Sequence, residues 1–386
     1  MQANGKRRSE ESGQTDMQSP DSHARSLRVG VLFGGRSGEH EVSLRSARNI
    51  MDALRTAGHQ VIPLGITPRG RWLTGGDPWR QLVDQTEQQG AEPAEGEDSW
   101  ALLPHAKNGH RLPAIDVVFP VLHGTYGEDG TVQGLLEMAN LPYVGCGVLA
   151  SAVAMDKGLA KQIFAQAGFR QPDYRIVLRK RWRTQMETVM EELEHALGYP
   201  LFVKPANLGS SVGISRANGR DELAAALELA CRYDRRAVVE IAVPNAREIE
   251  VSVLGNDEPE ASLPGEIRPH GGFYDYEAKY VNDSSELIIP AAINSELTAL
   301  ARSIAIDAFR AIDGAGLARV DFLLDDAEGV LYLNEINTLP GFTQISMYPK
   351  LWEASGVSSS VLVDRLLQLA LERYEDRQEN STTREL

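Results

Sequence analysis

Residues 27–35 read LRVGVLFGG, an apolar run that ends in two glycines. Such a run is typical of a buried strand, and paired glycines allow a tight turn after it. Apolar residues then recur at helical spacing over residues 43–57, and Gly58 is placed to end that helix. A strand that leads through a glycine turn into a helix is the first unit of an α/β fold.

The same order continues farther along the chain. Strands are predicted over residues 61–66 and 115–119, and a helix over residues 131–140. Strand, helix, strand and helix in alternation predict a parallel sheet with helices on both faces. Residues 67–112 interrupt this order and are rich in glycine, glutamate, glutamine and proline, so they are interpreted as a surface insertion with little chemical content.

The pattern changes near Val144. A helix is predicted over residues 156–167, with Asp156 as its N-cap and Gly168 as its stop. Strands and helices then follow without strict alternation, which predicts an α+β unit after the α/β one. The strands are expected over residues 201–204, 237–243, 247–254, 317–324 and 330–336, and the helices over residues 221–232, 295–312 and 358–372.

Composition excludes several classes of protein. The chain has 386 residues, 42% of them hydrophobic, and a net charge of −15, which argues against a nucleic-acid-binding protein. No apolar run approaches the roughly 20 residues that a membrane span requires, and no signal peptide is recognisable. Cys146 and Cys231 form no metal or disulfide pattern and fit a reducing compartment. We therefore expect a cytoplasmic protein with polar tails over residues 1–26 and 375–386.

The strongest chemical pattern lies at the ends of two predicted strands. Arg319 and Asp321 share one face of a strand, and Glu335 and Asn337 share a face of the next one. If these strands are neighbours, two carboxylates and an amide gather beside one guanidinium group. Hard oxygen ligands of this kind suit Mg²⁺ held against substrate phosphates. The alternative is an ion-paired strand end on a solvated face, and two acid-bearing strand ends before a glycine-containing loop favour the metal.

A second pattern is KPANLGSSVG at residues 204–213. Glycines let backbone N–H groups approach an anion, and serines add donors. The segment is not a Walker P-loop, and alone it could be an ordinary turn. Together with Lys157 and Lys279, Lys204 at its start suggests several lysines around a polyphosphate, although each lysine alone is more often simply solvated.

Two polar loops follow the first and third predicted strands, where α/β sheets bind their ligands. Residues 34–43 read GGRSGEHEVS and residues 123–130 read HGTYGEDG. Glu39 could hold an ammonium group, or it could only complement the helix dipole together with Glu41. His123 alone would be structural, but two glycine-rich polar loops at two strand ends indicate one site.

Residues 273–280 read FYDYEAKY, and three tyrosines among charges are typical of a lid that excludes water, although an ordinary exposed loop has the same pattern. No Ser-His-Asp, Cys-His or HExxH arrangement is present. The residues by themselves therefore indicate a cytoplasmic enzyme of two or three domains that uses Mg²⁺ and a nucleotide.

The motifs taken in order resemble the D-alanine–D-alanine ligase family over residues 27–374. They are GGRSGEHEVS, HGTYGEDG, MDK, FVKPANLGSSVG, FYDYEAKY, ARVDF and NEINTLPGFTQIS. The resemblance implies an α/β N-terminal domain followed by an α+β ATP-grasp fold of two subdomains. It implies a substrate domain over residues 27–145, a central subdomain over 146–239 and a C-terminal subdomain over 240–374.

The resemblance also implies a reaction. ATP phosphorylates one D-alanine to an acyl phosphate, and the amine of a second D-alanine displaces the phosphate, giving a dipeptide for peptidoglycan precursors. Two Mg²⁺ (or Mn²⁺) ions and a homodimer are expected from the family, with no nucleic-acid or membrane partner.

The resemblance gives the residues their expected roles. The metal would be held by Asp321, Glu335 and Asn337, the phosphates would be contacted by Lys157, Lys204 and Lys279, and the nucleoside would be contacted by Glu240, Glu248 and Phe273. The ammonium group of the first D-alanine would be bound by Glu39, with His123 nearby, and the second substrate would be contacted by Ser346 and Met347. The oxyanion of the tetrahedral intermediate would be stabilised by Arg319 and the Gly341 backbone. Glu39, Ser210 and Tyr280 match a hydrogen-bonded trio that pins the lid.

Tyr280 also bears on specificity, because the D-alanine–D-lactate ligases depart from this lid sequence. We therefore expect an amine as the second substrate, and D-serine stays open beside D-alanine. Two further alternatives remain: another ATP-grasp carboxylate–amine ligase, and a nucleotide-binding regulator without activity. The matches at Glu39, Tyr280 and Ser346 argue against the former, and the intact set around Arg319 argues against the latter.

Overall fold

The computed structural model describes residues 26–73, 76–87, 114–209, 211–269 and 285–381. Three sheets organise these residues, and each has its own apolar core. Among the described helices none is both long and apolar enough to cross a lipid bilayer.

The first sheet is built as the alternating pattern predicts. Its order is β3-β2-β1-β4, with β1 parallel to both neighbours and β3 antiparallel at the edge. Helices α1 and α12 pack on one face of this sheet and α3 packs on the other. Side chains alternate along β1, so Phe33 joins the core beneath α1 and α12, called the first core, whereas Leu32 joins the core beneath α3. The elements are β1 (Arg28–Gly34), α1 (His40–Thr56), β2 (Gln60–Ile66), β3 (Trp72–Leu73), α2 (Pro78–Glu87), β4 (Val117–Val121), α3 (Thr131–Met138) and α12 (Ser359–Gln378).

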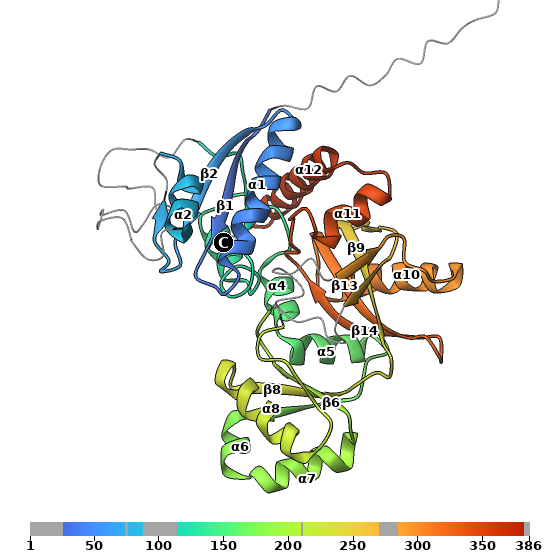
Figure 1. Ribbon diagram of the computed structural model, residues 1–386. Coiled ribbons are helices and arrows are strands. Elements are labelled where there is room, and N and C mark those ends of the chain that lie inside the picture. The colour runs from blue at the N-terminus through green and yellow to red at the C-terminus, as the bar shows by residue number, and fades with distance from the viewer. Residues whose placement is uncertain (1–25, 74–75, 88–113, 210, 270–284, 382–386) are drawn as a thin grey trace, which may run out of the picture.

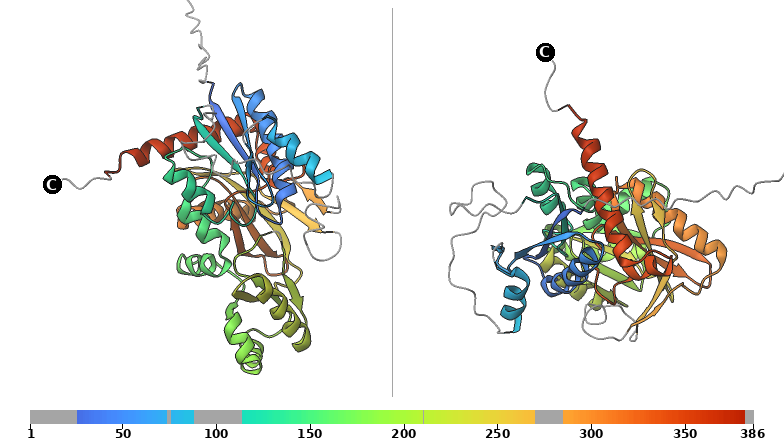
Figure 2. Two further views of the ribbon diagram at one scale, coloured as in Figure 1. Left: turned by 90° about the vertical axis from the view of Figure 1, so that its left-hand side faces the viewer. Right: turned by 90° about the horizontal axis from the view of Figure 1, so that it is seen from above.

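Helix α12 comes from the far end of the chain and lies beside α1, as Figures 1 and 2 show. Leu362 and Leu366 are fully buried in the core of the N-terminal sheet. Arg373 ties this helix down by donating to the carbonyl oxygens of Gly145 at 2.6 Å and Tyr143 at 3.2 Å. The first domain is therefore completed by residues that the sequence pattern assigned to the last one.

The second sheet is small and antiparallel, in the order β5-β8-β6-β7, and it lies at the bottom of Figure 1. Helices α7 and α8 cover one face, where Leu193 and Leu227 pack against Val203 and Val239. Its elements are β5 (Tyr174–Leu178), α6 (Arg179–Thr184), α7 (Met186–Leu197), β6 (Leu201–Pro205), β7 (Ser215–Ala217), α8 (Arg220–Tyr233) and β8 (Arg236–Ile241).

The third sheet is the largest, in the order β12-β11-β9-β13-β14 with β10 paired to β9. Helices α4, α5 and α10 bury their apolar sides against it, and α11 packs near β11. Its elements are α4 (Val148–Met155), α5 (Lys157–Gln166), β9 (Arg247–Gly255), β10 (Glu260–Ala261), β11 (Gly265–Pro269), β12 (Ser285–Ile288), α10 (Ser295–Ala311), β13 (Gly316–Asp325), β14 (Val330–Asn337) and α11 (Met347–Ala354).

The structure differs from the predicted boundaries in three places. Strand β8 runs across the boundary predicted between residues 239 and 240, because its hydrogen-bond partners β5 and β6 lie in the small sheet. The expected surface insertion contains α2, whose Leu82 is buried in the first core. Helix α12 continues to Gln378, inside the tail predicted from residue 375. The predicted tail over residues 1–26 lies, except for Ser26, outside the described residues.

Candidate functional site

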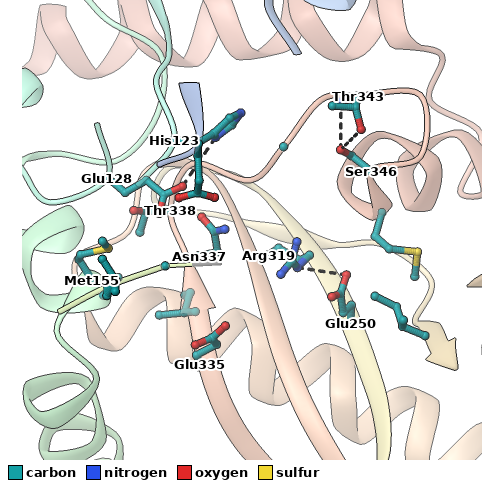
Figure 3. Close-up of a pocket in the computed structure, with 18 of the residues that line it drawn as sticks. His123, Glu128, Met155, Glu250, Arg319, Glu335, Asn337, Thr338, Thr343 and Ser346 are labelled. Atoms are coloured by element: carbon teal, nitrogen blue, oxygen red, sulfur yellow. Dashed lines mark hydrogen bonds and ion pairs between the residues drawn. The ribbon is translucent and has the colours of Figure 1, made fainter. Parts of the chain in front are cut away.

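The main cleft lies between the three sheets and holds about 950 Å³ of space, part of it open to solvent. Its walls come from the loops after β1 and β4, from the loop after β6, and from strands β9, β13 and β14 with the loop that follows β14 (Figure 3). The glycine-containing polar loops after β1, β4 and β6 therefore meet at one cleft.

The register of β13 and β14 brings the predicted four side chains together. Arg319 lies opposite Asn337, and Asp321 lies opposite Glu335. Because residues two apart share a face of a strand, all four lie on the same side of the sheet. The two strands are neighbours, so the predicted convergence of two carboxylates and an amide beside one guanidinium group is confirmed.

Arg319 is held by two carboxylates. Its Nε and Nη2 donate to Asp321 Oδ1 and Oδ2, both at 2.7 Å, in a bidentate pair. Its Nε also lies 3.1 Å from Glu250 Oε2, a contact that Figure 3 shows. Glu250 on β9 is buried, so the guanidinium is clamped between two strands and aimed at the cleft.

The expected metal ligands do not form a cage by themselves. Within the described ranges, no three carboxylate, histidine or cysteine side chains lie close enough to hold an ion. Asp321 is occupied by Arg319, and Glu335 Oε2 lies 3.4 Å from Lys157 Nζ. Mg²⁺ is commonly bound by one or two carboxylates together with substrate phosphates. The oxygen donors of Asp321, Glu335 and Asn337 therefore fit an ion that arrives with a phosphate ligand.

Glu39 is placed by two loops that lock together. Ser37 Oγ donates to the carbonyl oxygen of His123 at 2.7 Å and accepts from the Glu39 N–H at 3.1 Å. Gly124 has a φ of +74°, and a Cβ there would lie 2.5 Å from Glu39 Oε2, so only glycine fits. A Cβ at Gly209 would lie 3.2 Å from the same oxygen, which brings the loop of the small sheet to the Glu39 carboxylate.

His123 is buried and joins three segments. Its Nδ1 lies 3.2 Å from the carbonyl oxygen of Leu339, and its Nε2 lies 3.1 Å from Ser46 Oγ. A carbonyl oxygen can only accept, so in the neutral ring Nδ1 carries the proton and Nε2 accepts from the Ser46 hydroxyl, whose oxygen also accepts from the Phe342 N–H. Nδ1 also lies 3.7 Å from a Glu128 carboxylate oxygen. His123 thus ties helix α1 to the loop after β14.

The loop after β14 forms the opposite wall. Asn337 Oδ1 accepts from the Leu339 N–H at 2.9 Å, which turns the chain at the strand end. Gly341 and Ser346 line the cleft, and Ser346 Oγ accepts from the Thr343 N–H at 2.9 Å. Met347 also lines it, although it is buried against Leu351 and Ile267.

Lys157 lies at the start of α5, which begins after the predicted N-cap. The Asp156 carboxylate accepts from the Leu159 N–H at 3.0 Å and pairs with Arg236. Lys157 Nζ donates to the carbonyl oxygen of Leu208 at 2.9 Å, so it anchors the glycine- and serine-rich loop after β6. The lysine therefore touches both that loop and Glu335 of the large sheet.

Glu240 lies in a buried group of charges. Its Oε2 is 3.0 Å from Lys161 Nζ, and its Oε1 pairs with Lys204 Nζ. Burial alone would raise the pKa of the Glu240 carboxyl, but the two ammonium groups outweigh it and lower that pKa to about 2. Burial lowers the pKa of Lys161, whereas for Lys204 the nearby Glu240 outweighs burial and raises the pKa.

Glu248 lines a second, smaller hollow beside the main cleft. Asp321 and Asn334 also line this hollow, and Glu250 and Glu335 are shared between the two. Glu240 and Lys204 line neither of them, because they face each other below the loop after β6. The predicted residues Ser210, Phe273, Lys279 and Tyr280, with the lid that they define, lie outside the described residues.

Sequence reasoning missed three charged residues of the site. Glu250 lies within the strand predicted over residues 247–254 but was given no role, although its carboxylate meets Arg319. Glu128 lies in a quoted loop motif and lines the cleft. Lys161 had one available signal: it lies one helical turn after Lys157 and next to Ala160 and Phe164, on the buried side of α5.

Comparison with known proteins gives a consistent result. Two family models match: "D-ala D-ala ligase N-terminus" over residues 28–146 and "D-ala D-ala ligase C-terminus" over residues 163–368. A D-alanine–D-alanine ligase of Heliobacterium modesticaldum is 54% identical over 92% of this chain and 98% of its own. One from Natranaerobius thermophilus is 49% identical, with the same shares covered.

Two solved structures are similar throughout. The D-alanine-D-alanine ligase from Coxiella burnetii has a TM-score of 0.76 and 38% identity, covering 92% of this chain and 98% of its own. The VanG D-Ala:D-Ser ligase from Enterococcus faecalis has a TM-score of 0.76 and 36% identity, covering 90% and 100%.

Proposed function

The chain belongs to the D-alanine–D-alanine ligase family, and from this premise we propose how its residues join two D-alanine molecules with ATP. It is an ATP-dependent, ADP-forming ligase of the ATP-grasp type, and its dipeptide product serves peptidoglycan synthesis. The observation that carries the assignment of roles is the register of β13 and β14, which sets Arg319 opposite Asn337 and Asp321 opposite Glu335 in the cleft.

The first step is phosphoryl transfer, in which positioning and charge neutralisation matter most. The carboxylate of the first D-alanine attacks the γ-phosphate of ATP. ADP is the leaving group, and the product is an acyl phosphate of D-alanine. Lys157, Lys204 and Lys279 contact the phosphates. Asp321, Glu335 and Asn337 would hold two Mg²⁺ or Mn²⁺ ions, which would neutralise charge on the phosphates. Support comes from the oxygen donors at one edge of the large sheet, beside Lys157.

The nucleoside lies toward the small sheet. Glu240 and Glu248 take the adenine and ribose region, with Phe273 packed near the adenine. Support for Glu248 comes from its place in the hollow next to Asp321 and Glu335. The support for Glu240 is its match to the family motif, since its carboxylate is buried between Lys161 and Lys204 and lines neither hollow.

The second step builds an anion. The amine of the second D-alanine attacks the acyl carbonyl, and phosphate leaves the tetrahedral intermediate. Arg319 and the Gly341 backbone stabilise its oxyanion, where preorganised charge acts most strongly. Support comes from the two carboxylates that fix the Arg319 guanidinium before any substrate binds.

The amino acids lie at the other end of the cleft. Glu39 binds the ammonium group of the first D-alanine, with His123 beside it, and Ser346 and Met347 contact the second substrate. By the family resemblance, Ser210 and Tyr280, which lie outside the described residues, would form a hydrogen-bonded trio with Glu39. Support comes from the buried Glu39 carboxylate, which faces the cleft beside Gly124 and Gly209.

The experiment is phosphate release from ATP and Mg²⁺ with D-alanine alone, with the product identified by mass. D-Alanyl-D-alanine with stoichiometric phosphate is the expected result. Release only when D-lactate is added would overturn the choice of an amine acceptor. ATP binding without any release would favour a regulator instead of an enzyme.

D-Serine is the second candidate acceptor, because the similar VanG structure is that of a D-Ala:D-Ser ligase. Equal concentrations of D-alanine and D-serine in one reaction distinguish the two, and D-alanyl-D-alanine is the expected main product. A homodimer and a cytoplasmic location complete the proposal. The two buried free thiols of Cys146 and Cys231 support a reducing compartment, and light scattering on the eluting protein tests the dimer.

A further inference from the structure

The small sheet presents two different faces, because side chains alternate along its strands. Val203 and Val239 lie opposite each other and point into the apolar core below α7 and α8. One residue farther along, Lys204 and Glu240 point to the other face, toward helix α5. Lys161 of α5 meets them there. The sheet thus carries charge on the face that meets the large sheet.

The three charged groups are almost without solvent. The side chains of Lys161, Glu240 and Lys204 are 3%, 2% and 11% exposed. The carboxylate is shared: one oxygen lies 3.0 Å from Lys161 Nζ, and the other pairs with Lys204 Nζ. Two positive charges therefore face one negative charge in the interior.

The two lysines are not equivalent. Lys204 Nζ also donates to Asn334 Oδ1 at 3.3 Å, on the strand that carries Glu335. Lys161 lies beneath the Tyr174 ring, with Nζ 5.4 Å from the ring centroid. Lys204 therefore contacts a residue that lines the smaller hollow, whereas Lys161 is enclosed between helix and sheet.

We infer that Lys161 is a positioning residue for ATP: it is the permanent counter-ion of Glu240 and thereby frees the charge of Lys204 for the nucleotide phosphates. The inference rests on the proposed role of Lys204. A buried carboxylate without a cation is strongly disfavoured, so Lys204 alone could not both neutralise Glu240 and bind a phosphate. Because Lys161 stays paired with one carboxylate oxygen of Glu240, the Lys204 ammonium can move from Glu240 to an ATP phosphate without leaving the Glu240 carboxylate unpaired.

The experiment compares Lys161→Met, Glu240→Gln and the double variant with the unchanged enzyme. Lys161→Met is expected to raise both the KM for ATP and the Kd of a non-hydrolysable ATP analogue by about tenfold or more, because Lys204 is then retained by Glu240. The KM for D-alanine is expected to change by less than about twofold. In the Glu240→Gln background the same lysine substitution is expected to have little further effect on either ATP constant.

Several results would overturn the inference. They are an unchanged KM and Kd for ATP, an equal rise in the KM for D-alanine, or an undiminished effect in the Glu240→Gln background. If Lys161→Met does not fold, Lys161→Gln takes its place, because it removes the positive charge but keeps a hydrogen-bond donor beside Glu240. A rise confined to the ATP constants supports the inference, and its absence refutes it.

Lys180→Met is the matched control, because it removes an exposed lysine of the same part of the chain and is expected to change nothing. The unchanged enzyme distinguishes a failure of the proposed function from a failure of the role proposed for Lys161. If it makes no dipeptide, the proposed function fails; if it does and Lys161→Met binds ATP normally, only the role of Lys161 fails.

Discussion

At the end of the cleft next to the N-terminal sheet, Ser37, Ser46 and His123 are held by hydrogen bonds, largely to backbone groups. At the end next to the small sheet, Lys161, Lys204 and Glu240 are held by one another's charge. Hydrogen bonds to the backbone fix a geometry that does not depend on a ligand. A buried group of charges is stable only when each charge has a partner of opposite sign. Its pairing can therefore change when a bound anion offers a lysine a second partner.

The difference suits what each end is proposed to bind. A small amino acid needs a rigid recess, and the interlocked loops around Glu39 form one. ATP brings several negative charges, and a lysine that pairs with a carboxylate in the free enzyme can pair with an ATP phosphate instead. Arg319 lies between the two ends and combines both devices, since carboxylates hold it in a bidentate geometry.

The largest effect is expected where the two ends meet. Arg319→Ala is predicted to lower kcat by about 10²–10³-fold, because a preorganised oxyanion donor is lost. The Kd of an ATP analogue is expected to change little, which calorimetry checks. Arg319→Lys keeps a charge but not the bidentate fork, and it should recover only part of the rate. Turnover that survives the alanine substitution would contradict the oxyanion role.

The second prediction concerns the charged end and acid. The folded-state pKa of Glu240 is about 2, below its ordinary value of 4.5. Its contribution to the free energy of unfolding is therefore complete above about pH 4.5 and is lost as the pH falls toward 2, on the order of 3 kcal/mol. Urea unfolding from pH 6 to pH 3 should show the gap between wild type and Glu240→Gln narrowing. A gap that is independent of pH would show that the carboxylate charge is not what stabilises this end.

The third prediction concerns the hydrogen-bonded end. Ser46→Ala removes the donor to His123 Nε2 and the acceptor of the Phe342 N–H, both buried, at a cost of about 1–3 kcal/mol. The KM for D-alanine should rise while the KM for ATP stays the same, because only the amino-acid end loosens. The exposed Ser359→Ala serves as the control. A change in the KM for ATP of the same size would mean that the two ends are not independent.

The smallest effect is expected for charges that water reaches. Arg220 pairs with Glu187 and Glu194 on the outside of the small sheet's helices. Exposed pairs are screened and contribute little, so Arg220→Ala should leave the Tm unchanged within the error of the measurement. A marked fall in Tm would weaken the claim that burial distinguishes the charge group around Glu240.

Much of this site could be predicted because its signals are local. Asp156 caps α5 as expected, since a cap depends on the residues within one turn. Arg319 and Asp321 share a face because alternation is built into a strand. That Asn337 and Glu335 lie opposite them required only that two successive strands pair, which is the common case.

Other features depend on contacts between distant parts of the chain. Nothing near residue 240 indicated that β8 pairs with β5 and β6, so the predicted boundary cut through a strand. The pairing of Glu250 with Arg319 needed the register of β9 against β13.

The sequence by itself therefore determined the classes of element, the family and many of the side chains that meet in the cleft, because periodicity, caps and motifs are properties of neighbouring residues. Only the tertiary structure decided that α12 completes the first core, that Lys161 shares Glu240 with Lys204, and that Ser46 supports His123. Those contacts join residues far apart in the chain, and their free energy depends on burial and partner geometry, which no local pattern records.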